Sequence, residues 1–152
     1  MKQCIENPND AEWGEYWRER LEGKKNKDWD KAAPGFFKRT RKDDYNSVLF
    51  NMLILDENDT VLDVGCGEGS ITVPLSRKVK KVIGIDSSEK MLEYLEKRAN
   101  DENVSNIETI LKPIEEIKYE DIGDVDVVVC SRSLNAIMPI EDVLGELNKI
   151  AN

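Results

Sequence analysis

The chain has 152 residues, a net charge of −9, three cysteines and no histidine. This length favours one domain, 1–152, which buries roughly 68–70% of its unfolded surface. The lack of histidine excludes a histidine-based catalytic relay, and the scattered Cys4, Cys66 and Cys130 disfavour a metal site and are typical of a reduced, cytoplasmic protein. The acidic charge disfavours nucleic acid as a partner, and no apolar run approaches the roughly 18 residues of a membrane span.

Residues 1–55 are predicted to form an N-terminal helical cap, and they hold eight of the ten aromatic residues. Apolar residues recur with helical spacing in 11–23 (AEWGEYWRERLEG) and in 43–55 (DDYNSVLFNMLIL). The stretch between them, 23–35 (GKKNKDWDKAAPG), is interpreted as a loop. Trp13, Tyr16 and Trp17 either pack the cap against the sheet or line a cationic ligand with their rings.

From residue 56 onward, short β-rich runs alternate with helical runs. The expected strands are 60–65, 81–86, 107–111 and 125–131, and the expected helices are 71–79 with Ser70 as its N-cap, 88–100 and 140–152. Strands that are apolar on both faces and alternate with helices indicate a parallel sheet covered on each side. Right-handed crossovers then give an α/β fold with a doubly wound, mostly parallel, Rossmann-like sheet.

The first expected strand runs into a glycine turn, VLDVGCGEGS (61–70). In doubly wound sheets, ligands bind at the carboxyl ends of the strands, and glycines let a ligand approach backbone N–H groups closely. Asp86 ends the second strand 21 residues after Gly65, where a carboxylate can accept hydrogen bonds from both hydroxyls of a ribose. The two features together predict a nucleoside site; the alternative is a ligand-free turn with Asp86 as a helix cap.

Two residues argue against a dinucleotide. A dinucleotide fingerprint reads G-x-G-x-x-G/A, and its third small residue packs the helix against the strand, whereas this chain has Ser70 there. Asp63 stands two residues before the turn, where its charge opposes a pyrophosphate and suits a positively charged ligand group. A nicotinamide-dependent oxidoreductase is therefore the less favoured interpretation.

These motifs resemble those of the class I S-adenosylmethionine-dependent methyltransferases. Residues 61–76 (VLDVGCGEGSITVPLS) are similar to the family's first motif, 82–97 (VIGIDSSEKMLEYLEK) to its second, and 126–134 (DVVVCSRSL) to its fourth strand and the following loop. The resemblance covers 60–150 and implies the strand order 3-2-1-4, S-adenosylmethionine as cofactor and methyl transfer to an acceptor that the sequence does not identify. The implied cofactor-binding residues are Asp63, Gly65, Cys66, Gly67, Gly69, Asp86, Ser87, Met91, Pro113, Ile114 and Ser131.

The resemblance also implies how these residues divide the cofactor among them. The glycine turn would face the methionine part, with Asp63 near the ammonium group. Asp86 would hold the ribose, Ser87 and Met91 would lie along the adenosine, and Ser131 would lie beside the sulfonium.

The adenine end departs from the family's pattern. Many relatives have an aspartate after the third strand that binds the adenine amino group, and Pro113 stands in its place here. The backbone N–H of Ile114, or the Glu115 side chain, would then supply the contact.

The resemblance implies in-line attack of a substrate nucleophile on the sulfonium methyl, which requires proximity and alignment more than a catalytic triad. The sequence therefore names no catalytic base; the candidates are Asp43, Asp44, Glu115 and Tyr16. Arg132, next to Ser131, either pairs with an acidic substrate or the cofactor carboxylate, or is a surface residue.

The family usually builds seven strands in the order 3-2-1-4-5-7-6, and the C-terminal strands are absent from this sequence. An alternative function is therefore a catalytically incomplete cofactor-binding module or a subunit that needs a partner. The fourth strand would be an edge, and the last helix would leave Leu144, Leu147 or Ile150 partly bare. We expect a homodimer through one of these two elements.

Overall fold

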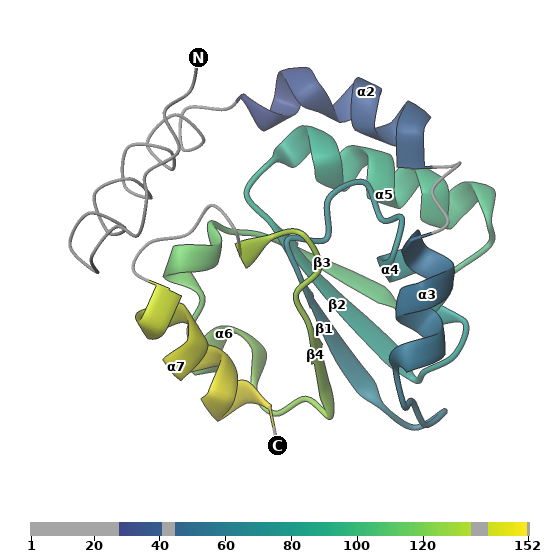
Figure 1. Cartoon of the computed structure of the whole chain (residues 1–152). Coiled ribbons are helices and arrows are strands. Elements are labelled where there is room, and N and C mark those ends of the chain that lie inside the picture. Colours follow the sequence, from purple (N-terminus) through teal and green to yellow (C-terminus); the bar gives the residue numbers. More distant parts are fainter. Residues whose placement is uncertain (1–27, 41–44, 135–139, 152) are drawn as a thin grey trace, which may run out of the picture.

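The computed structural model describes residues 28–40, 45–134 and 140–151. The described residues form a layered α/β unit (Figure 1). Its elements are α2 (Trp29–Thr40), α3 (Tyr45–Met52), β1 (Thr60–Val64), α4 (Thr72–Ser76), β2 (Lys81–Asp86), α5 (Glu89–Asp101), β3 (Ile107–Leu111), the 3₁₀ helix Ile114–Glu116, α6 (Tyr119–Ile122), β4 (Val127–Val129) and α7 (Ile140–Ile150). Among the helices within these ranges, none is long and apolar enough to cross a membrane.

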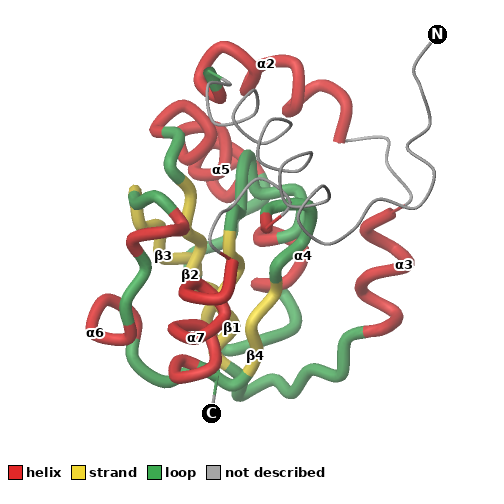
Figure 2. The backbone as a smooth tube through the Cα atoms, turned by 60° about the vertical axis from the view of Figure 1, so that its left-hand side comes forward, coloured by secondary structure: helices red, strands yellow, loops and turns green. Residues whose placement is uncertain are grey.

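The four strands run parallel in the order β3-β2-β1-β4, which confirms the expected fold and strand order. They lie side by side through the middle of the molecule (Figure 2). Thr60 of β1 lies opposite Lys81 of β2, and Val61 lies opposite Val127 of β4. Because every pair of neighbouring strands is parallel, the carboxyl ends of all four strands lie at the same end of the sheet.

Successive strand residues face opposite sides, so each side of the sheet has its own core. Figure 1 shows α6 and α7 on one side and α3, α4 and α5 on the other. On the α7 side, Leu62 and Ile85 pack with Val143, Leu147 and Ile150. On the other side the buried residues are Val61, Ile71, Leu75, Val79, Val82 and Val129, with Leu49 and Phe50 of α3 and Leu53 just after it packed against them.

The interpretation of residues 23–35 as a loop is wrong for 29–35, because α2 begins at Trp29, while 23–27 lie outside the described residues. Asp28 provides the missing start signal: its carboxylate accepts from the Lys31 N–H at 3.1 Å, and its carbonyl accepts from the Ala32 N–H at 3.2 Å. Ala33 on the inner face is fully buried. The predicted helix in 43–55 exists as α3, whereas the one in 11–23 lies outside the described residues.

The helix covering part of 71–79 is shorter than expected, and Ser70 does not cap it. The N-cap position of α4 is Ile71, which makes no capping bond, while the Ser70 carbonyl accepts from the Asn46 side chain at 2.8 Å. By contrast, α5 follows the expected range closely, and the Ser88 hydroxyl caps it by accepting from the Met91 N–H at 3.1 Å.

The fourth strand has three residues, not seven. Only Val127–Val129 pair with β1, and Val125 instead forms an isolated parallel bridge with Ala151, just after α7. In the last helix, Leu144 is exposed, as expected for one of its three apolar residues, whereas Leu147 and Ile150 are buried.

Candidate functional site

The glycine turn after β1 is tied to the end of β2. The N–H groups of Gly65 and Cys66 both donate to the Ile85 carbonyl, at 2.8 and 2.9 Å. The turn then closes on itself, since the Gly69 N–H donates to the Cys66 carbonyl at 3.1 Å. All three glycines have positive φ, which side chains disfavour, so the sequence specifies this backbone path.

The three glycines serve different purposes. A Cβ on Gly65 would lie 2.4 Å from the Ser133 Cβ, and one on Gly69 would lie 2.8 Å from the Leu95 Cγ on α5. A Cβ on Gly67 would find nothing closer than the Met91 sulfur at 4.0 Å. Gly65 and Gly69 are therefore required for packing, whereas Gly67 borders open space.

Asp86 closes the other side of that space. Its Oδ2 accepts from the Gly67 N–H and its Oδ1 from the Ser88 N–H, each at 2.9 Å. The Ser87 backbone N–H is a third donor to this carboxylate, which has about four acceptor positions in all. Burial raises the pKa of Asp86, while the backbone N–H groups oppose this shift.

Asp63 lies at the base of the site, 2% exposed. The Thr72 hydroxyl donates to its Oδ2 at 2.7 Å. Burial, with smaller contributions from the charges of Asp86 and Glu68, raises the pKa of Asp63 to about 7. A buried carboxyl with one partner and other acids nearby is an environment in which a bound cation is stabilised.

Glu68 and Arg98 form a buried ion pair that the sequence analysis missed. The Arg98 guanidinium lies 3.7 Å from the Glu68 carboxylate, and the Phe37 ring of α2 packs under it, 5.2 Å from ring centre to guanidinium carbon. The sequence held a sign of this pair, because Arg98 continues the apolar stripe of Met91 and Leu95 at helical spacing. An arginine on such a stripe requires a buried partner.

The loop after β4 meets the first turn of α3. The Ser131 hydroxyl donates to the Tyr45 hydroxyl at 3.1 Å, and the Arg132 guanidinium lies 3.9 Å from the centre of the Tyr45 ring. Arg132 itself has φ of 60°, a costly backbone conformation for a residue with a side chain. Beside it, the Ser133 hydroxyl is buried without a hydrogen-bond partner among the described residues.

The remaining predicted residues occupy different depths. Met91 is buried at the turn, Ser87 and Pro113 are exposed, and the Ile114 side chain approaches the Gly65 backbone. Cys66 is buried against Gly84, and burial raises the pKa of its thiol.

Of the four candidate bases, the structure describes only Glu115. Glu115 is exposed, while Asp43, Asp44 and Tyr16 lie outside the described residues, as do Trp13 and Trp17.

A surface cleft of about 530 Å³ lies away from this site, beside α6 and α7. Both lysines that line it, Lys118 and Lys149, pair with Glu146, at 3.8 and 2.7 Å. We therefore do not regard it as the functional site. In the parts of the chain that the structure describes, no three histidine, cysteine or acidic side chains gather into a group that could hold a metal ion.

Comparisons with known proteins agree with this geometry. A family model described as a methyltransferase domain matches residues 55–152. The ubiquinone biosynthesis O-methyltransferase of Acinetobacter baumannii is 40% identical over 77 residues, which are 51% of this chain and 32% of that protein. The chain thus spans about a third of the length of the curated relatives matched first.

Two solved structures are also similar. A putative S-adenosylmethionine-dependent methyltransferase from Listeria monocytogenes is 31% identical, with a TM-score of 0.60 over 70% of this chain and 46% of that one. An S-adenosylmethionine-dependent methyltransferase from Aquifex aeolicus is 25% identical, with a TM-score of 0.65 over 78% of this chain and 67% of that one.

Proposed function

Since the chain belongs to the class I S-adenosylmethionine-dependent methyltransferases, we propose that it binds S-adenosylmethionine at the glycine turn and takes part in methyl transfer to an acceptor nucleophile. One observation carries the proposal: a buried carboxyl, Asp63, and a partly buried one, Asp86, lie at the glycine turn, where Gly67 borders open space. This arrangement suits a ligand with both a cationic end and a ribose.

The residues around the turn fit the parts of the cofactor one by one. Asp86 would accept hydrogen bonds from the ribose hydroxyls with the acceptor capacity that its backbone donors leave. Asp63 offers its charge to the ammonium group at the buried end. Met91, Ser87, Pro113 and Ile114 then line the adenosine side.

The turn and the loop after β4 complete the proposed pocket. Gly65, Cys66, Gly67 and Gly69 present their backbone to the methionine part, and Ser131 lies on the sulfonium side. The orphaned Ser133 hydroxyl beside Gly65 adds a buried polar group that a ligand or water would satisfy.

When bound, the cofactor would supply an electrophilic methyl group on its own sulfonium. The chain's residues then need to bind, orient and exclude water, which accounts for a site without a catalytic triad. We assign no residue as a catalytic base.

Titration calorimetry tests this proposal. S-adenosylhomocysteine should bind, and NAD should not, because Asp63 would oppose its pyrophosphate. Failure of S-adenosylhomocysteine to bind would overturn the proposal. A screen for methyl acceptors would follow, with hydroxyl compounds first because the matched Acinetobacter protein is an O-methyltransferase.

A second candidate is a cofactor-binding module that needs a partner for activity. The three-residue β4 favours it, since within the described residues no further strand pairs with its outer edge, and the isolated bridge to Ala151 is made by Val125, before β4 begins. The two candidates differ in outcome: the module would bind S-adenosylhomocysteine but methylate nothing by itself.

We further propose that 1–55 and 56–152 form one domain, since α2 and α3 pack on the rest of it. We also propose that the chain forms a homodimer through β4 or α7. It would act in the cytoplasm, without nucleic-acid or membrane partners.

A further inference from the structure

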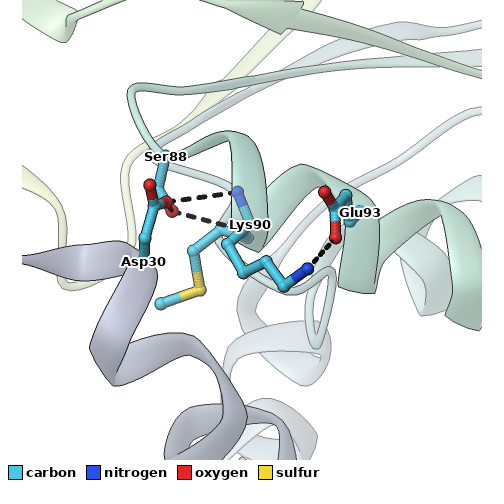
Figure 3. A network of polar contacts seen from close by, with 5 residues as sticks. Asp30, Ser88, Lys90 and Glu93 are labelled. Carbon is cyan, nitrogen blue, oxygen red and sulfur yellow. Dashed lines mark hydrogen bonds and ion pairs between the residues drawn. The ribbon is translucent and has the colours of Figure 1, made fainter.

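Asp30 on α2 reaches the first turn of α5, 58 residues further along the chain (Figure 3). Its Oδ1 accepts from the Ser88 hydroxyl at 2.5 Å and from the Lys90 backbone N–H at 3.2 Å. The Lys90 ammonium group pairs with Glu93, so Asp30 meets Lys90 through the backbone. An aspartate from one helix therefore binds the N-terminus of another.

Ser88 links Asp30 to the candidate cofactor site. Its N–H donates to Asp86 Oδ1, its hydroxyl donates to Asp30, and the same hydroxyl accepts from the Met91 N–H. Asp86 in turn accepts from the Gly67 N–H through its other oxygen. A continuous chain of hydrogen bonds thus runs from α2 through Ser88 and Asp86 to the glycine turn.

Capping of α5 does not by itself require Asp30, because Ser88 already caps that helix. The Asp30 carboxylate has two further effects. It fixes the direction of the Ser88 hydroxyl, and it places a negative charge at the positive end of α5. Both effects fix the position of Ser88, whose N–H donates to Asp86.

The other end of α2 also touches the site. Phe37 stacks on Tyr94 of α5, with ring centres 4.8 Å apart, and packs against Arg98, which pairs with Glu68 in the glycine turn. Helix α2 is therefore joined to the site at two separate points.

We propose that Asp30 is a positioning residue for cofactor binding: through Ser88 it orients Asp86, so that docking of α2 and binding of the cofactor strengthen each other. This inference rests on the proposed function. Coupling of this kind is reciprocal, so a cofactor that gains affinity from α2 docking must stabilise that docking by the same factor.

Calorimetry with S-adenosylhomocysteine tests the inference. Asp30→Ala should bind about fivefold or more weakly than the wild type. Asp30→Asn, which keeps an acceptor for both donors, should retain most of the affinity. The control Lys31→Ala removes a neighbouring exposed side chain that pairs with Asp28 and should bind as the wild type does.

A double-mutant cycle tests the route. In the Asp86→Ala background, Asp30→Ala should cause no further loss, because the residue through which it acts is gone. An equal loss in both backgrounds would mean that Asp30 only stabilises the fold, and would overturn the proposal.

Hydrogen exchange of the wild type supplies a test that does not depend on a variant folding. S-adenosylhomocysteine should slow exchange of the α2 amides; unchanged exchange would overturn the inference. Equal affinity of wild type and Asp30→Ala would overturn it too and leave the proposed function standing, whereas no binding by the wild type would overturn both.

Discussion

The Asp63 carboxyl is held inside the molecule with a pKa of about 7, well above its ordinary value of 3.8. Between about pH 4 and 7 the folded state therefore binds more protons than the unfolded state, and this residue makes stability fall as pH rises. Asp63→Asn removes the effect. In urea unfolding, wild type should lose stability relative to Asp63→Asn across this window, by on the order of a few kcal/mol.

Parallel pH profiles for the two proteins would show that the Asp63 pKa is not raised. A function in cofactor binding adds a second expectation. Asp63→Asn should bind S-adenosylhomocysteine more weakly at pH 8 even where it is the more stable protein, which is the signature of a charge retained for binding.

Asp86 is expected to contribute to affinity through the acceptor capacity that its backbone donors leave. Asp86→Ala removes charge-assisted bonds of about 1.5–3 kcal/mol each, part of which water replaces. We expect roughly 10–100-fold weaker binding of S-adenosylhomocysteine by calorimetry. Glu89→Ala, which removes an exposed acid from the same helix end, is the matched control; unchanged affinity in Asp86→Ala would place the ribose elsewhere.

At the scale of elements, the glycine turn separates binding from packing. Gly67→Ala places a methyl group in open space at a cost of about 1–2 kcal/mol for its left-handed backbone. It should fold and yet bind S-adenosylhomocysteine at least about tenfold more weakly. Gly69→Ala drives a methyl group into Leu95 and should lower the melting temperature further. Normal binding by Gly67→Ala would mean that the ligand does not approach the turn.

The elements also show where sequence patterns suffice. The strands 81–86 and 107–111 have the predicted bounds because each is a short β-prone stretch between polar residues. The sequence did not predict α2, because Pro34 and Gly35 are residues that usually interrupt helices. In the structure, Asp28 starts the helix, and contacts between α2 and α5 stabilise it. Packing outweighed local propensity there.

The candidate site divides in the same way. The turn and Asp86 follow from local spacing, so the sequence predicted them. The partners Asp30 and Thr72 depend on which segments the fold brings together, and no local pattern marks them. For β4, the shortened pairing reflects a strand with only one full neighbour, whose Val125 turns to Ala151 instead.

At the scale of the whole molecule, apolar surface gathers near β4. The first turn of α3 contacts the loop after β4 through Tyr45 and Ser131. On α3, Tyr45, Val48 and Met52 recur at helical spacing and are 39%, 60% and 76% exposed. Within the described residues no strand pairs with the outer edge of β4. A surface of this kind favours association.

We therefore expect the isolated chain to self-associate through the β4 edge, most simply as a two-fold dimer. Val127, Val128 and Val129 are strongly β-prone and carry none of the lysine, proline or bulge protections of an edge strand. Val128→Lys should shift the population toward monomer in light scattering over a range of concentrations.

The matched control is Leu111→Lys at the opposite edge, where Leu111 is exposed, and it should leave assembly unchanged. Because Val128 packs partly against the α7-side core, a melting curve must show that Val128→Lys is folded. A wild-type chain that stays monomeric at high concentration would contradict the dimer and would mean that the β4 edge is protected within the chain itself.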